Sequence, residues 1–381
     1  MPRCTPQNEK KIVIILMIAL LLFLSSCSDS PILIGFSGPL KGKYSDLGVQ
    51  GRNGALMAIE DINAAGGVDG RMLELIVKDD QSTPEGAIKG DKELIDEGVS
   101  VIIGHMTSGQ SLAALRALKD EKIVYLSPTV STPLVHGIKD NFFRLMSTLT
   151  DLSQGLAEYS IDVLNNTRLA VVWDVTNMDF TQPYKNVFIK EFTARGGKLV
   201  GEVVIESKDK AVDWQEVVDE LKFMNPDAVV MVTAARDLAG FAQYSKLNKA
   251  DWSILSSMWG YTKELIQTGG KSVEGIVFVV HFAEDDLSEK YTEFRKRFIA
   301  RFGWPPNFGA AFSYQAVKVF AEAVRLNGGK TEGIAEFLPG ISFESSVIGP
   351  FTIDEFGDVK RKGHIVTVKD GDFVSISRRA P

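Results

Sequence analysis

The segments Val101-Ile-Ile-Gly-His-Met-Thr-Ser108 and Ile123-Val-Tyr-Leu-Ser-Pro-Thr-Val-Ser131 each join an apolar run to a turn rich in hydroxyl groups. The apolar runs predict buried strands of an α/β sheet, and in such a sheet ligands bind beyond the carboxyl ends of the strands. Hydroxyls and free backbone N–H groups at that place suit a carboxylate or another small anion. Ser108 and Ser131 are therefore candidate ligand-binding residues, although each alone is also an ordinary helix N-cap.

Strands and helices alternate along the first two thirds of the chain. Apolar patterns predict strands at 32–36, 73–77, 169–173, 199–205, 228–232 and 254–255. Helical patterns lie between them, at 47–65, 84–97, 111–120, 183–195, 214–224 and 237–248. Strands separated by helices of about ten to fifteen residues imply parallel sheets with both faces covered. Two such series predict an α/β protein with two similar doubly wound lobes.

The last third of the chain is less regular. We expect a strand at 275–280 and helices at 288–302 and 309–327. After Gly349-Pro350, short apolar segments at 351–353, 364–368 and 373–376 are separated by turns at Gly357 and Asp370-Gly371. Paired short segments with glycine turns predict hairpins.

The amino terminus has the pattern of an export signal. Basic residues precede thirteen apolar residues, Ile12 to Leu24, and then comes Leu24-Ser25-Ser26-Cys27. A basic segment, a short apolar segment and small residues before a cleavage site describe a secretory signal, and the apolar run is too short for a comfortable membrane span. The cysteine matches a bacterial lipobox, so we expect residues 1–26 to be removed and Cys27 to carry a lipid. An ordinary signal peptide with an incidental cysteine is the alternative.

The predicted mature chain, residues 27–381, is long and acidic. Its 355 residues exceed the usual size of a single core, so two domains are expected. Loss of the basic leader changes the formal net charge from −7 to −9, which argues against nucleic acid or anionic lipid as a partner. Of the two cysteines, Cys4 would leave with the leader and Cys27 would be lipidated, so we expect no disulfide and no metal-binding thiol.

Motifs of enzymatic chemistry are missing from the sequence. It contains no Gly-x-Gly-x-x-Gly or Walker loop and no Gly-x-Ser-x-Gly elbow. The histidines His105, His136, His281 and His364 lack the spacing of metal ligands. His105 follows a predicted strand near the candidate site, where packing at the strand end is the favoured interpretation. We therefore predict a binding protein that is not an enzyme and uses no cofactor.

Several blocks together resemble one family, the branched-chain amino-acid binding proteins, which are type I periplasmic substrate-binding proteins of ABC transporters. The resemblance covers the chain from about Pro31 to its carboxyl end. The blocks are Ile34-Gly-Phe-Ser-Gly-Pro-Leu40, Tyr44-Ser-Asp-Leu-Gly48, the Gly-rich helix 54–67, Lys78-Asp79-Asp80, the two hydroxyl turns, Phe143-Arg144, Ser346-Val-Ile-Gly-Pro350 and Asp354-Glu-Phe-Gly-Asp358. The resemblance implies two Rossmann-like lobes that are joined by three crossings and close on a ligand. We expect lobe I to comprise 27–147 and 278–349, and lobe II 148–277 and 350–381.

The resemblance also implies roles for residues of the first lobe. Ser108 matches the serine that holds a ligand carboxylate, and Thr129 and Ser131 match a pair that offers a backbone carbonyl and a hydroxyl to an amino-acid head group. Tyr44 matches an aromatic residue of the cleft. Thr107, with Ser82, stands where the family has a cysteine pair.

The second lobe departs from the family pattern. Family proteins place an aromatic and an acidic residue there, and this sequence has Ala235 and Trp259, with Arg236 next to the first. Arg236 could grip an anion or be a solvated helix-start residue. Trp259 could stack on a ligand or pack between the lobes. Asp151, at the entry to the second lobe, could pair with a ligand ammonium or cap a helix.

The expected function is capture of a small carboxylate-bearing ligand, an amino acid or a related organic acid. Aromatic and dicarboxylic acids stay open because of the changed second lobe. We expect a monomeric, exported, lipid-anchored protein that delivers its ligand to an ABC permease. The alternative is a sensory module that presents its closed form to a receptor kinase or chemoreceptor.

Overall fold

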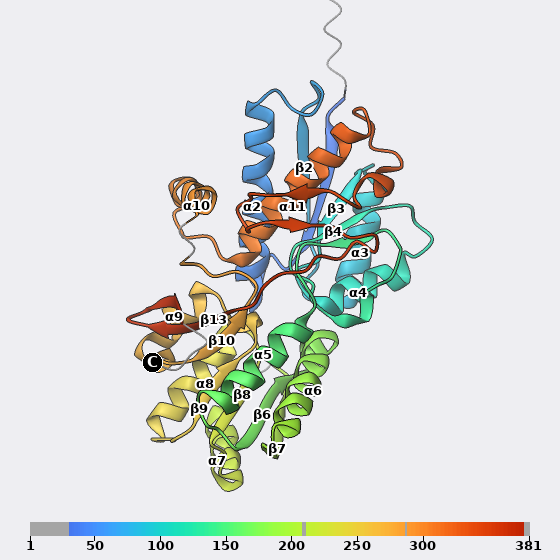
Figure 1. Ribbon diagram of the computed structural model, residues 1–381. Helices are drawn as coiled ribbons and strands as arrows, with labels where there is room; N and C mark the ends of the chain where they lie inside the picture. Colours follow the sequence, from blue (N-terminus) through green and yellow to red (C-terminus); the bar gives the residue numbers. More distant parts are fainter. Residues whose placement is uncertain (1–29, 208–210, 286–287, 377–381) are drawn as a thin grey trace, which may run out of the picture.

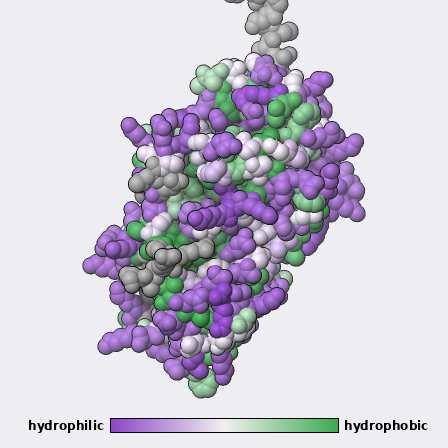
Figure 2. Space-filling view, viewed as in Figure 1, coloured by the Kyte–Doolittle hydropathy of each residue, from purple (hydrophilic) through white to green (hydrophobic). Residues whose placement is uncertain are grey.

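The computed structural model describes residues 30–207, 211–285 and 288–376, and it has two α/β lobes stacked end to end (Figure 1). The predicted leader and Cys27 lie outside the described residues. Within this part of the chain, no helix combines the length and the apolar character needed to cross a bilayer. Hydrophilic side chains cover most of the face seen in Figure 2.

Lobe I contains a five-stranded parallel sheet in the order β2-β1-β3-β4-β5. Its strands are β1 (Ile32–Gly38), β2 (Leu73–Asp79), β3 (Val101–Gly104), β4 (Tyr125–Ser127) and β5 (Phe142–Arg144). Helices α3 (Pro84–Asp96) and α4 (Ser108–Ala117) pack together, and α2 (Ser45–Ala64) packs with α11 (Phe308–Leu326). Helix α10 (Glu289–Phe302) lies beside α2, to which it is tied by the ion pairs Arg297–Asp61 and Arg301–Glu60.

The ends of the helices follow from local chemistry. Helix α3 begins after Thr83, whose side chain accepts a hydrogen bond from Gly86 N, and Pro84 is its first residue. Helices α2 and α11 approach so closely that a Cβ atom on Gly54 would lie 2.0 Å from the carbonyl oxygen of Ala310. Only glycine fits at this contact.

Lobe II contains a seven-stranded sheet in the order β14-β13-β10-β9-β8-β6-β7. Five strands are parallel to one another: β6 (Arg168–Asp174), β7 (Lys198–Ile205), β8 (Ala228–Val232), β9 (Ser253–Ser256) and β10 (Val277–Val280). The antiparallel strands β13 (His364–Lys369) and β14 (Asp372–Ser375) complete one edge as the hairpin predicted at Asp370-Gly371. The helices are α5 (Leu149–Asp162), α6 (Met178–Ala194), α7 (Trp214–Met224), α8 (Ala235–Leu247) and α9 (Lys263–Gly269).

The sheets correct two of the predicted lobe boundaries. Strand β10 belongs to the lobe II sheet, so the chain returns to lobe I after Val280 and not before 278. Strand β12 (Phe351–Thr352) pairs with β11 (Ser342–Phe343) on lobe I, and not across Gly357 with β13 as the predicted hairpin required. The strands with which β10 and β12 pair place each of them in its lobe. An apolar run in the sequence does not show which strand it will pair with.

A buried ion pair connects the last crossing to lobe I. Arg144, at the end of β5, is 1% exposed and donates through Nε to Asp358 Oδ1 at 2.6 Å. Its Nη1 atom donates to the carbonyl oxygen of Thr132 at 2.7 Å. The pair therefore fixes the crossing against the loop that carries Ser131.

Candidate ligand-binding cleft

A cavity lies between the lobes, where the carboxyl ends of strands from both sheets face each other. The space there that protein atoms do not fill is about 310 Å³, including its opening to solvent. Its lining consists of Leu47, Met106, Thr107, Ser108, Thr129, Ser131, Asn177, Phe180, Met258, Trp259 and Phe308. Four predicted hydroxyl residues thus meet at one cavity, together with Trp259.

Ser108 and Ser131 present hydroxyl groups to this cavity. Ser108 is the first residue of α4 and is 3% exposed, and Ser131 follows β4 and is 2% exposed. Neither acts as a helix cap: Thr107 is the N-cap of α4, and Thr132 caps the short helix after Ser131. No hydrogen bond within the described part of the chain uses either serine Oγ atom. Both hydroxyls are therefore available to a ligand.

The other polar groups of the lining are held by protein partners. Thr129 Oγ1 donates to the carbonyl oxygen of Met106 at 2.8 Å, and the Thr107 hydroxyl donates to the Gln110 side chain. Asn177, from lobe II, accepts a hydrogen bond from Gly109 N in the first turn of α4 at 3.2 Å. This last bond joins the two lobes at the cavity edge.

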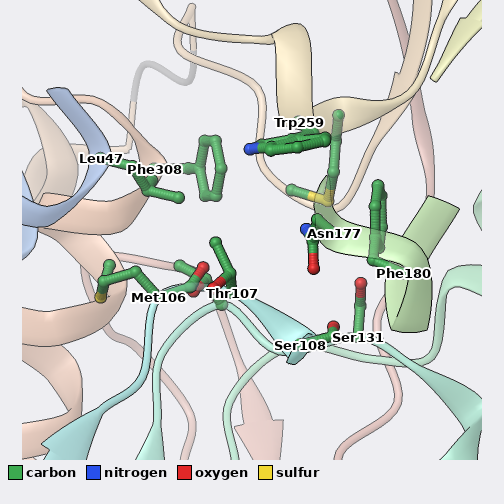
Figure 3. A pocket seen from close by; sticks show the side chains of 11 residues that line it. Leu47, Met106, Thr107, Ser108, Ser131, Asn177, Phe180, Trp259 and Phe308 are labelled. Atoms are coloured by element: carbon green, nitrogen blue, oxygen red, sulfur yellow. The ribbon is translucent and has the colours of Figure 1, made fainter. Parts of the chain in front are cut away.

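The cavity is polar at one end and apolar at the other. Figure 3 shows Ser108, Ser131 and Asn177 on one side together with the ring of Phe180, and Leu47, Met106 and Phe308 on the other side, with Thr107 near Met106. Trp259 forms a wall along the lobe II side. Such an arrangement suits a short molecule with a hydrogen-bonding head and an apolar body.

Tyr44 lies behind this wall and does not line the cavity. Its ring packs against Trp259 with a centroid distance of 5.4 Å, and its hydroxyl donates to Asp174 Oδ2 at 3.1 Å. Burial, and then the charge of Asp174, raises the pKa of the Tyr44 hydroxyl well above its ordinary value. The predicted aromatic residue of the cleft therefore supports Trp259 from lobe I.

Tyr44 belongs to a polar cluster between the lobes, which we call the acid cluster: Lys43, Tyr44, Asp174, Ser207 and Asp237. Lys43 Nζ lies 2.5 Å from Asp237 Oδ1 and donates to the carbonyl oxygen of Ser207 at 3.0 Å. Ser207 Oγ lies 2.5 Å from Asp174 Oδ2 and 2.9 Å from Asp237 Oδ2. Burial raises the pKa of the Asp237 carboxyl, and Lys43 partly offsets that shift.

Besides Tyr44, three predicted site residues lie outside the cavity. Asp151 is exposed in the first turn of α5, for which Thr148 is the N-cap, so it neither faces the cleft nor caps the helix. Ala235 begins α8 and is buried. Arg236 is half-exposed and does not line the cavity; it pairs with Glu264 in a separate pocket between the lobes, which Asp46 also lines.

His105 is a core residue, as the favoured interpretation held. It is fully buried, with Nδ1 3.2 Å from Asp80 Oδ2 and Nε2 3.0 Å from Asp91 Oδ2. Burial opposes the charged imidazolium, but these two carboxylates outweigh it and raise the pKa of His105 to about 10. Across the described residues, no group of three or more acidic, histidine or cysteine side chains could hold a metal ion.

Sequence reasoning identified Trp259 but missed the other lobe II residues of the lining, and it also missed Leu47, Met106 and Phe308 on lobe I. Asn177 and Phe180 follow the carboxyl end of β6, and Met258 follows β9. The rule that identified Ser108 and Ser131, a position just beyond a parallel strand, applies equally to these residues.

Together the fold and the cleft define a two-lobed α/β binding protein with a ligand site between its lobes. The family model of the periplasmic binding proteins matches residues 31–372, so the chain belongs to that family. A Leu/Ile/Val-binding protein homologue of Brucella abortus is 25% identical over 354 residues, which cover 88% of this chain and 89% of the relative.

Solved structures have the same fold. A leucine-binding protein from Thermotoga maritima superposes with a TM-score of 0.83 and 26% identity, covering 91% of this chain and 98% of the other. A solute-binding protein of an ABC transporter from R. palustris, solved with benzoate, gives a TM-score of 0.82 at 22% identity and covers 91% and 95% of the two chains.

Proposed function

We propose that this protein captures a small carboxylate-bearing ligand between its lobes and delivers it to an ABC permease. The observation that carries the proposal is the polarised cavity, in which two unbonded serine hydroxyls face an apolar chamber. Family membership supports a role in binding, and we propose no catalysis.

The carboxylate would lie at the polar end of the cavity. Ser108 and Ser131 would donate their hydroxyl protons to its oxygens, and the amino-terminal end of α4 adds favourable electrostatics for an anion. The body of the ligand would fill the space between Trp259 and Phe308. Because Asn177 and Trp259 come from lobe II, ligand binding would favour the closed arrangement of the lobes.

Export and delivery complete the proposal. Residues 1–26 would direct the chain out of the cytoplasm, and a lipid on Cys27 would hold a monomeric binding protein at the membrane surface. A Cys27→Ser variant should then be released from the membrane fraction, and retention of the variant would refute the anchor. Sensing through a receptor kinase or chemoreceptor is the alternative use of the closed form. Permease and ATPase genes beside this gene would favour transport, and a kinase gene would favour sensing.

A thermal-shift screen of residues 28–381 tests the binding proposal. Amino acids, aromatic acids and dicarboxylates are compared, because a ligand that binds only the native state raises the melting temperature by mass action. The affinity of the best ligand should fall at least about tenfold in Ser108→Ala and in Ser131→Ala, since each loses a hydrogen bond to a charged group. Ser345→Ala, at an exposed serine outside the cleft, is the matched control. Unchanged affinity in both cleft variants would refute the assignment.

A further inference from the structure

We infer that the ligand carries no ammonium group, and that Lys43 is a specificity-determining residue because it neutralises the acid cluster from within the protein. The inference rests on the proposed function and narrows its ligand class. Its starting point is the lining of the cavity, which contains hydroxyls, one amide and apolar side chains but no charged side chain among the described residues.

An amino acid needs more than a carboxylate site. Its ammonium group, once out of water, requires an anion or several acceptors, because an unpaired buried charge is costly. The Thr107 and Thr129 hydroxyls donate to protein acceptors, and the Asn177 side-chain oxygen accepts from Gly109 N. Each keeps a lone pair that could accept from an ammonium, but none carries a negative charge. None of these replaces a carboxylate.

The acid cluster is a built acidic site between the lobes, and each of its carboxylate oxygens lies within hydrogen-bonding distance of a protein group. Asp174 Oδ1 accepts from Thr176 N at 2.8 Å, while Oδ2 has the Tyr44 and Ser207 hydroxyls. Asp237 Oδ1 has Lys43, and Asp237 Oδ2 shares the single Ser207 hydroxyl proton with Asp174 Oδ2. Both aspartates are buried, at 0% and 3% exposure. A ligand ammonium would have to displace one of these partners.

Lys43 enters the cluster from lobe I, on the outer side of Tyr44. Its ammonium group makes the contacts that a ligand cation would otherwise make with Asp237 and the Ser207 carbonyl. Tyr44, the member of the cluster next to Lys43, contacts Asp174 with its hydroxyl and the cavity wall residue Trp259 with its ring. The protein thus supplies its own cation, and closure of the lobes forms this ion pair with or without a positively charged ligand.

The ligand class that remains is a monocarboxylate with an aromatic or branched apolar body. Phe180, Met258 and Trp259 offer it ring and sulfur contacts. A second carboxylate has no partner either, since Arg236 lies outside the cavity and is paired with Glu264.

Calorimetry on the native protein, residues 28–381, gives the direct test. The probes are two matched pairs that differ only in the ammonium group: 3-phenylpropanoate against phenylalanine, and 4-methylpentanoate against leucine. We expect at least one deaminated acid to bind about 100-fold more tightly than its amino acid. An amino acid that binds as tightly as its partner would overturn this inference while leaving the proposed function intact. If no carboxylate in the wider screen binds, the proposed function fails and the inference with it.

Substitutions at the loop test the role of Lys43. In Lys43→Met the acid cluster loses its own cation, so the preference for the deaminated acid should shrink about tenfold. Lys43→Arg keeps the cation and should keep the preference, and Lys41→Met, at an exposed lysine of the same loop, is the matched control. An unchanged ratio in a folded Lys43→Met protein would refute the assignment of Lys43.

Discussion

Replacing Asp358 by Asn should destabilise the protein strongly, although the substitution preserves the size of the side chain. Asp358 is 4% exposed and accepts from Arg144 Nε at 2.6 Å and from Gly137 N at 2.8 Å, with His136 Nδ1 at 2.7 Å. Burial tends to lower the pKa of the Arg144 guanidinium, and Asp358 opposes that shift. The carboxylate is therefore the group that lets a cation remain in the core.

The magnitude follows from what the variant leaves behind. Arg144 would stay charged and 1% exposed, without its anion. Breaking a buried ion pair from one side costs about 3–5 kcal/mol, a large part of a typical stability of about 5–15 kcal/mol. Ligand affinity should also fall, because Arg144 holds the Thr132 carbonyl oxygen, one residue from Ser131.

Urea unfolding followed by circular dichroism measures the effect. The matched control is Glu322→Gln, which breaks an exposed pair with Arg325 on α11 and should cost less than about 0.5 kcal/mol. A loss below about 1 kcal/mol for Asp358→Asn would show that the Arg144 charge is not buried as the structure describes, and the reasoning would fail.

Three other substitutions follow from single contacts. The pKa of His105 is raised in the folded state, so the stability that its charged form contributes should be fully present below pH 6.5 and be lost as the pH rises through about 10. In a His105→Gln variant the melting temperature should depend less on pH over that range. Gly54→Ala should cost about 3 kcal/mol or more in urea unfolding, since its Cβ would overlap the Ala310 carbonyl, and a neutral result would mean that α2 and α11 can separate cheaply. Trp259→Ala should lower the affinity of the best ligand at least about tenfold in calorimetry, while the contact of the ligand with Ser131 persists. An unchanged affinity would show that Trp259 does not contact the ligand.

Periodicity predicted the regular elements well. The helix expected at 47–65 rests on Gly51, Ala55, Ala58, Ile59 and Ile62 at spacings of three and four residues, and all five are buried in α2. Such a pattern is predictive because the spacing of the apolar residues indicates which face of a helix or strand is buried. It does not record which strand lies next to which, and for that reason β10 and β12 were assigned to the wrong lobes.

The misplaced start of α6 explains why two residues of the lining, Asn177 and Phe180, were missed. Pro183 is a typical first residue of a helix, so the sequence predicts a start there and leaves the preceding residues in a loop. The helix instead begins at Met178, with Pro183 inside it. Because a proline near the first turn removes at most one internal hydrogen bond, the helix can tolerate it. The earlier start brings Asn177 and Phe180 to the cavity.

Contacts across the cleft lie beyond any local pattern. Lys43 and Asp237 are 194 positions apart, and nothing in the sequence around either residue points to the other. Their pairing depends on how the two lobes meet, which is decided by the crossings and by packing such as that of Tyr44 on Trp259. The family resemblance directed attention to Ala235 and Arg236, the two residues directly before Asp237. Under our inference, selection between an amino acid and an acid without an ammonium group depends on whether the protein or the ligand supplies the cation that pairs with Asp237. Lys43, in the lobe I loop, already supplies that cation.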